Sequence, residues 1–154
     1  MNLYKLAAER GQDRTIGVGV IGAGKFASMF LAQVPTMPGL RISAIADLNP
    51  DGARARLAQV GWDDERIAAT RIGDNGMEIA GRDDVDVVIE ATGDPVAGVR
   101  HALAVIEAGK HIVMVNVEAD VLAGPAIAKR ARSAGLVYSM AYGDQPALIA
   151  EMVD

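Results

Sequence analysis

The chain has 154 residues, 51% of them hydrophobic and 23% charged, with a formal net charge of −5 at pH 7. This length suits a single domain over residues 1–154, and the acidic balance argues against nucleic acid as a partner. The sequence lacks cysteine, which excludes disulfides, thiolate nucleophiles and most structural zinc sites. We expect no signal peptide, no membrane span and a cytoplasmic location, because no run reaches about 18 apolar residues.

Short apolar runs alternate with amphipathic stretches along the chain, which is typical of parallel strands connected by helices. Strands covered on both faces are predicted at residues 16–21, 41–46, 85–91, 112–115 and 136–140, and a further strand is predicted at 67–72. Helices are predicted between them, the first with Phe26, Phe30 and Val34 on one face, and also at residues 3–10 and from Pro146. This order predicts a Rossmann-type α/β fold, a doubly wound and mostly parallel sheet with helices on both faces.

A glycine motif lies between the first predicted strand and the first predicted helix. Residues 22–27, GAGKFA, match the G-x-G-x-x-G/A pattern of dinucleotide-binding folds. Gly22 permits a tight turn, Gly24 lets the backbone approach a pyrophosphate, and Ala27 keeps the helix close to the sheet. The start of the helix then offers free N–H groups and a partial positive charge to phosphates. The motif therefore predicts a dinucleotide site.

Asp47 ends the second predicted strand, 20 residues after Ala27. A carboxylate at this place accepts hydrogen bonds from the ribose hydroxyls of the adenosine half, and it would repel a 2′-phosphate. NAD is therefore favoured as the cofactor. NADP stays possible, because loop conformations can bring Arg54 or Arg56 to a phosphate, although both also suit a solvated helix surface.

The other strand ends supply the rest of the predicted site, since ligands bind beyond the carboxyl ends of parallel strands. Thr92 and Gly93 would let a dinucleotide pass over the backbone, and Asn116 could orient a nicotinamide amide or a substrate hydroxyl. Glu118 suits either that role or a helix cap. The predicted cofactor-binding residues are Gly22, Ala23, Gly24, Lys25, Phe26, Asp47, Thr92, Gly93 and Asn116.

Several other polar residues have no assigned catalytic role. Asp94 comes directly before Pro95, and Asp144 lies two residues before Pro146, so both suit helix caps, while His101 and His111 suit surface or capping positions. Glu90 is unusual, because a carboxylate at the end of an apolar strand needs partners or a proton. No motif indicates a metal site, and no catalytic residue is identified.

Four segments carry a resemblance to a known family: GVIGAGKFA, DVVIEATGDP, GKHIVMVNVEADVLAGP and VYSMAYGDQPAL. Across nearly its whole length the chain resembles the N-terminal NAD(P)-binding domain of the homoserine-dehydrogenase-like oxidoreductases. It is most similar to the SAF-domain-linked branch that includes deoxyxylulose-phosphate reductoisomerase-like enzymes. The resemblance implies NAD(P)-dependent hydride transfer at a carbonyl or alcohol carbon.

The chain departs from these relatives at two strand ends. Val117 occupies the position of a lysine that contributes to catalysis in homoserine dehydrogenases, and Asp47 lies where reductoisomerase-like enzymes tend to have basic residues. Family members continue into substrate-binding and dimerisation segments. We therefore expect the N-terminal part of a longer, homo-oligomeric enzyme with a small-molecule substrate. The alternative is a stand-alone NAD(H)-sensing or interaction module without catalysis.

Overall fold

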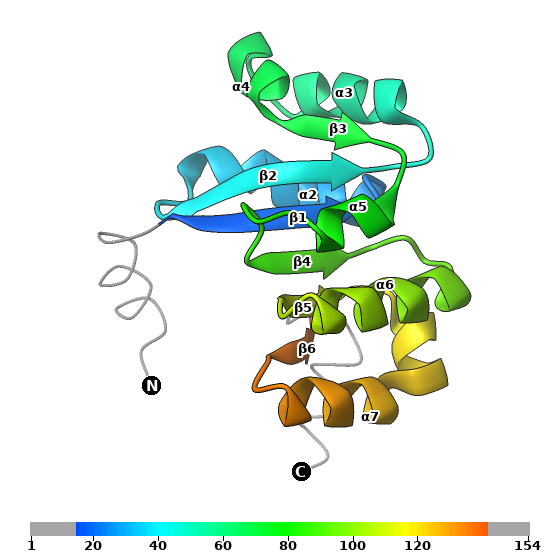
Figure 1. The fold of residues 1–154 in the computed structure, drawn as a ribbon. Coiled ribbons are helices and arrows are strands. Elements are labelled where there is room, and N and C mark those ends of the chain that lie inside the picture. Colours follow the sequence, from blue (N-terminus) through cyan, green and yellow to red (C-terminus); the bar gives the residue numbers. More distant parts are fainter. Residues whose placement is uncertain (1–14, 142–154) are drawn as a thin grey trace, which may run out of the picture.

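The computed structural model describes residues 15–141, which form one parallel sheet in the strand order β3-β2-β1-β4-β5-β6 (Figure 1). The strands are β1 (Ile16–Ile21), β2 (Leu40–Ala46), β3 (Arg71–Gly73), β4 (Val87–Glu90), β5 (His111–Met114) and β6 (Tyr138–Met140). The helices are α2 (Lys25–Gln33), η1 (Val34–Thr36), α3 (Pro50–Gln59), α4 (Asp64–Ala69), α5 (Gly76–Ala80), α6 (Pro95–Glu107) and α7 (Val117–Ser133). The strand order reverses between β1 and β4, and in such sheets the ligand crevice lies beyond the carboxyl ends of the strands at that point.

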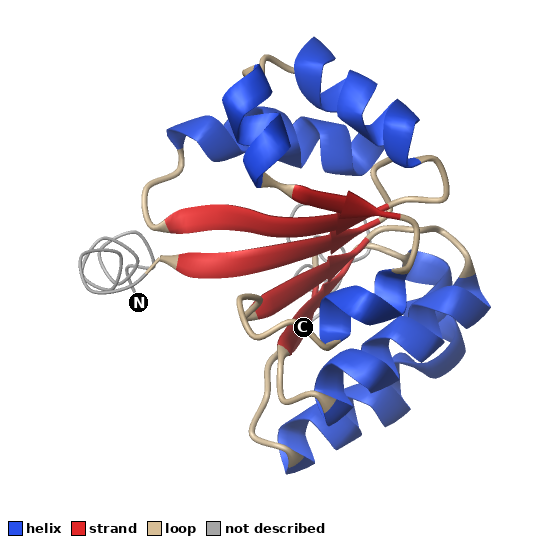
Figure 2. Ribbon diagram, turned by 45° about the horizontal axis from the view of Figure 1, so that its top comes forward, coloured by secondary structure: helices blue, strands red, loops and turns tan. Residues whose placement is uncertain are grey.

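Two groups of helices cover the two faces of the sheet (Figure 2). On one face α2, α3 and the segment before α4 enclose a core that includes Leu31, Leu57 and Trp62. On the other face α5, α6 and α7 enclose a second core that includes Val105 and Ile127. Because the central strands are covered on both sides, their sequences read as continuous apolar runs, and the predicted doubly wound architecture is confirmed.

One predicted strand is wrong over most of its length. Residues 67–69 belong to helix α4, and only Arg71–Gly73 pair with β2. The helix begins because the Asp63 side chain accepts a hydrogen bond from the backbone N–H of Arg66 at 2.7 Å. Acidic residues fill the first turn, which favours a helix N-terminus. The predicted helices at residues 3–10 and from Pro146 lie outside the described residues.

The buried face of α2 also differs from the predicted one. Ala27 and Leu31 are the buried residues of this helix, whereas Phe26 is 37% exposed and Phe30 packs at the margin of the core. The small side chain of Ala27 faces the sheet, as the glycine motif requires, and this position sets the rotation of the helix. Val34 is buried as predicted, but it lies in the short η1 segment.

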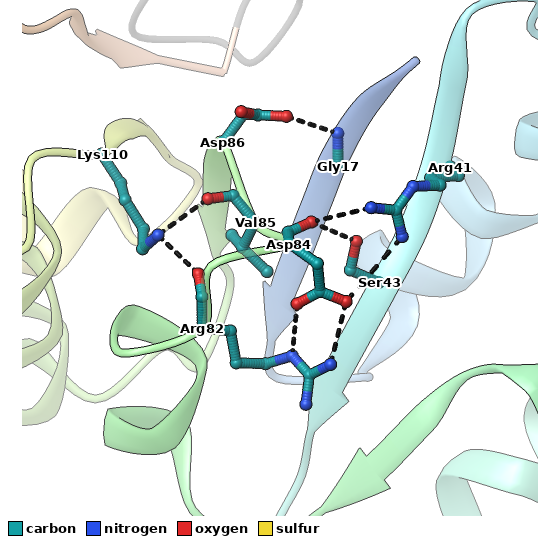
Figure 3. Close-up of polar contacts among 8 residues, drawn as sticks. All are labelled: Gly17, Arg41, Ser43, Arg82, Asp84, Val85, Asp86 and Lys110. Carbon is teal, nitrogen blue, oxygen red and sulfur yellow. Dashed lines mark hydrogen bonds and ion pairs between the residues drawn. The ribbon is translucent and has the colours of Figure 1, made fainter. Parts of the chain in front are cut away.

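A network of polar contacts closes the amino-terminal edge of the sheet, opposite the expected crevice (Figure 3). The Lys110 ammonium donates to the carbonyl oxygens of Arg82 and Val85, at 2.6 and 2.8 Å. Arg82 also donates two hydrogen bonds to the Asp84 carboxylate, at 2.8 and 2.9 Å, and the Asp84 carbonyl accepts from Ser43 at 2.6 Å. These contacts fix the loop between α5 and β4 against β2 and the start of β5.

Candidate dinucleotide site

The glycine motif forms a tight turn between β1 and α2. Gly22 has φ +92°, and a Cβ atom there would lie 2.6 Å from the carbonyl oxygen of Ala91, so a glycine is required. Gly24 is the N-cap of α2 and gives the helix no side-chain cap. A Cβ built on Gly24 would meet no atom within 4 Å. The open N–H groups of this helix start and the free space beside them fit a dinucleotide pyrophosphate.

Asp47 lies beside this turn at the end of β2. Its Oδ2 accepts a hydrogen bond from the backbone N–H of Ala23 at 2.8 Å, and its Oδ1 accepts from Asn49 at 2.9 Å. Arg56 on α3 forms an ion pair with the same Oδ1 at 3.4 Å. Of the two alternatives left open for Arg56, this contact favours a place beside Asp47 over a purely solvated helix surface. This ion pair places one cation beside the Asp47 carboxylate.

A cavity of about 420 Å³ lies along the carboxyl ends of β1, β2 and β4. Four of the predicted cofactor residues line it: Gly22, Gly24, Asp47 and Thr92. The other five are not among its lining residues: Ala23, Lys25, Phe26, Gly93 and Asn116. Lys25 instead lines a separate hollow with Arg56, and Gly93 is an exposed turn residue with φ +75°.

Asn116 is the N-cap of α7 and is 2% exposed. Its Oδ1 accepts from the backbone N–H of Ala119 at 3.0 Å, while its Nδ2 donates to the carbonyl oxygen of Asp94 at 2.8 Å. The side chain thus joins the start of α7 to the loop between β4 and α6. Glu118, the other residue suggested for this role, is exposed in the first turn of α7.

Two residues outside the predicted set, the buried Glu90 and the partly buried His101, form a pair beside the cavity. Glu90 is 0% exposed, and its Oε1 lies 3.2 Å from Nδ1 of His101 on α6. His101 also lines the cavity, so its prediction as a surface or capping residue is wrong. The isolated carboxylate at the end of an apolar strand was the signal in the sequence, because such a group needs a nearby donor.

The remaining polar residues have structural contacts. Asp94 is confirmed as a helix cap, since its side chain accepts from Ala97 N–H at 2.7 Å. His111 Nδ1 accepts from Val137 N–H at 3.0 Å near the amino-terminal edge of the sheet. Burial raises the pKa of the Tyr138 phenol, and a 2.5 Å hydrogen bond to Asp120 adds to this effect. The predicted strand-end residues around Asp144 lie outside the described part of the chain.

Residues 16–142 match the GFO/IDH/MocA family, described as an oxidoreductase family with an NAD-binding Rossmann fold. The chain belongs to this family. The homoserine-dehydrogenase-like resemblance is thus confirmed only at the level of an NAD-binding oxidoreductase domain, because the matched family and the structural neighbours are of the GFO/IDH/MocA type. Within residues 15–141, no helix has the length and apolar character of a membrane span, and no acidic, histidine or cysteine cluster could hold a metal.

Several solved structures share the fold. An NAD-binding oxidoreductase from Klebsiella pneumoniae is 24% identical with a TM-score of 0.61, and the match covers 90% of this chain and 38% of that one. Myo-inositol dehydrogenase from Lactobacillus casei, solved with NAD(H) and myo-inositol, is 16% identical with a TM-score of 0.65, covering 90% and 41%. Biliverdin reductase from Synechocystis, solved with NADP+ and biliverdin, is 19% identical with a TM-score of 0.62, covering 81% and 37%.

This GFO/IDH/MocA domain therefore spans about two fifths of the length of the solved structures it matches. A search of curated protein sequences gives no match.

Proposed function

We propose that this GFO/IDH/MocA domain binds NAD(H) in the crevice between β1 and β4 and serves as the cofactor domain of a longer oxidoreductase. The observation that carries the proposal is the direct hydrogen bond between Asp47 and the glycine turn at Ala23. This contact supports the proposal, because it holds a carboxylate suited to binding ribose hydroxyls next to the open start of α2. When bound, the nicotinamide supplies hydride chemistry at a carbonyl or alcohol carbon of a small-molecule substrate.

The preference for NAD over NADP rests on the surroundings of Asp47. Its side chain is 17% exposed, and both carboxylate oxygens accept backbone hydrogen bonds, so the carboxylate is held in place beside the glycine turn. A 2′-phosphate would lie close to this charge. Arg56 could offset part of the repulsion, but in this structure its guanidinium is paired with Asp47. These contacts support NAD as the tighter ligand.

The test is a calorimetric titration of the purified chain with NADH and NADPH, together with a Gly24→Asp variant. Aspartate at this position would bring bulk and negative charge to the start of α2, so we expect saturable NADH binding in the wild type and its loss in the variant. Gly81→Asp is the matched control, because it adds the same group at the other end of the sheet, where a Cβ has room. A folded wild type that binds neither dinucleotide would contradict the proposal.

Three further proposals concern the oligomeric state, the family branch and the catalytic activity of the longer protein. We propose a homo-oligomer, which light scattering on that protein would test. Membership of the SAF-domain-linked branch is tested by the sequence that follows this domain. Turnover of aldehydes, ketones or sugar phosphates by the longer protein would distinguish an enzyme from an NAD(H)-sensing module, because the module would bind cofactor without consuming it.

A further inference from the structure

The two oxygens of the buried Glu90 carboxylate differ in their hydrogen-bond partners. Its Oε1 accepts a hydrogen bond from the Thr92 hydroxyl at 2.6 Å and lies 3.2 Å from Nδ1 of His101. Its Oε2 has no hydrogen-bond partner among residues 15–141. Burying a carboxyl group costs free energy unless the group is hydrogen-bonded, and Glu90 is 0% exposed. The two contacts at Oε1 offset part of this cost and fix the position of the side chain.

The direction of each hydrogen bond follows from the backbone. The Ala119 N–H can only donate, so it must point at Oδ1 of Asn116, and Nδ2 of Asn116 is then a donor. Nδ2 lies 3.3 Å from the Thr92 hydroxyl oxygen, which therefore accepts. The hydroxyl hydrogen of Thr92 is left for Glu90. The chain of donors thus runs from Asn116 through Thr92 to Oε1.

This order also fixes which nitrogen of the His101 ring donates to Glu90. Because Oε1 of Glu90 acts as an acceptor, the hydrogen on the ring must lie on Nδ1 for a hydrogen bond to form. In the neutral ring, Nε2 is then an acceptor, and no residue from 15 to 141 donates a hydrogen bond to it. Gly76 lies against this atom, since a Cβ on Gly76 would come within 2.8 Å of Nε2.

Both His101 and Gly76 line the cavity that Asp47 lines. The charged side chains in this lining are the carboxylates of Asp47, Asp74 and Asp94, which are acceptors too. Apolar side chains such as Ile21, Leu48 and Ala97 supply the rest of the wall. The cavity therefore fits a flat apolar group that carries hydrogen-bond donors at its edge.

We propose that Nε2 of His101, oriented by Glu90, accepts a hydrogen bond from the 6-amino group of the cofactor adenine. The assignment rests on the proposed NAD(H) function. With the ribose hydroxyls bonded to Asp47, the amine is the remaining donor of the adenosine half. Asp47 and Leu48 share this cavity with His101, which places the adenosine half, rather than the nicotinamide, beside the ring.

The test compares NADH with reduced nicotinamide hypoxanthine dinucleotide, which has a carbonyl in place of the 6-amino group. We expect the wild type to bind NADH roughly tenfold more tightly, because the carbonyl would face the Nε2 lone pair. In His101→Phe this preference should vanish. Glu90→Gln keeps an acceptor oxygen and should retain the preference, whereas Glu90→Leu should lose it.

A second measurement uses the wild type alone. The sequence has two histidines, so ¹⁵N-histidine NMR resolves His101 and uses His111, at the other end of the sheet, as an internal control. We expect Nδ1 of His101 to carry the hydrogen and Nε2 to shift on saturation with NADH, with His111 unchanged. Saturable NADH binding with no base preference and no shift at His101 would overturn this inference and leave the proposed function intact. Absence of any binding would instead contradict the proposed function.

Discussion

The carboxylate of Asp47 accepts a hydrogen bond from the backbone N–H of Ala23 at 2.8 Å, joining positions 24 residues apart. This contact links the end of β2 to the turn between β1 and α2. The turn proposed to bind the pyrophosphate and the carboxylate proposed to bind the ribose are therefore parts of one hydrogen-bonded unit. A change at Asp47 should affect both, which makes it the most informative position for ligand binding.

Replacement of Asp47 by serine should weaken NADH binding by roughly tenfold or more, because charge-assisted hydrogen bonds to the ribose are lost. NADPH should lose less affinity, since the charge facing its 2′-phosphate is removed, and the selectivity for NADH should narrow. Calorimetric titration with both cofactors measures this change. Asp51→Asn is the control, because that side chain is 99% exposed on α3 and its loss removes the same charge. Equal losses for both cofactors would contradict the role assigned to Asp47.

Gly22→Ala should destabilise the fold by about 3 kcal/mol or more. A residue with a Cβ is strained at a φ of +92°, and the added atom would lie 2.6 Å from a carbonyl oxygen. Gly61→Ala separates the two effects, because Gly61 has φ +90° and no atom within 4 Å of the added carbon. That variant should lose only about 1–2 kcal/mol. Urea unfolding measures both, and equal losses would show that the close approach to Ala91 has no cost.

The lowered pKa of Asp84 predicts that the free energy of unfolding depends on pH. The hydrogen bonds from Arg82 hold the pKa of this carboxyl below its usual value, against the opposing effect of burial. A depressed pKa in the folded state stabilises the protein fully above the unfolded pKa of about 3.9, and the contribution is lost as the pH falls through the folded value. The stability difference between the wild type and Asp84→Asn should therefore be largest near neutral pH.

Urea unfolding between pH 3 and pH 7, settings that span the carboxyl range, tests this expectation. Asp83→Asn, an exposed neighbour on the same loop, controls for the loss of one charge. A gap between wild type and Asp84→Asn that widens toward acid pH would contradict the sign of the effect.

Much of the fold could be predicted because strands covered on both faces leave continuous apolar runs. The run over Ile16–Ile21 was predicted with its observed bounds, and Gly22 occupies the turn that the motif required. The segment around Ile67 was mistaken for a strand because short apolar runs suit either structure. Its capping residue Asp63 and the acidic first turn were visible in the sequence and indicate the helix.

The site was less predictable, because its polar contacts join residues from separate elements. Asn116 was expected to face the cofactor, which stays a prediction, whereas its hydrogen bonds to α7, to the loop after β4 and to Thr92 were not predictable from the sequence. Glu90 was recognised as unusual, yet its partner His101 lies on the following helix. Helical periodicity shows which residues share a face, but it does not show which carboxylate that face will meet.

The network around Lys110 lies at the edge of the sheet away from the cavity (Figure 3). Its bonds join backbone carbonyls and side chains of this chain and use no group that lines the cavity. Substitutions within this network can thus change the free energy of unfolding without removing a group that lines the cavity. A related domain could therefore differ in the residues that line the cavity and still keep this network, which stabilises the fold at the opposite edge of the sheet.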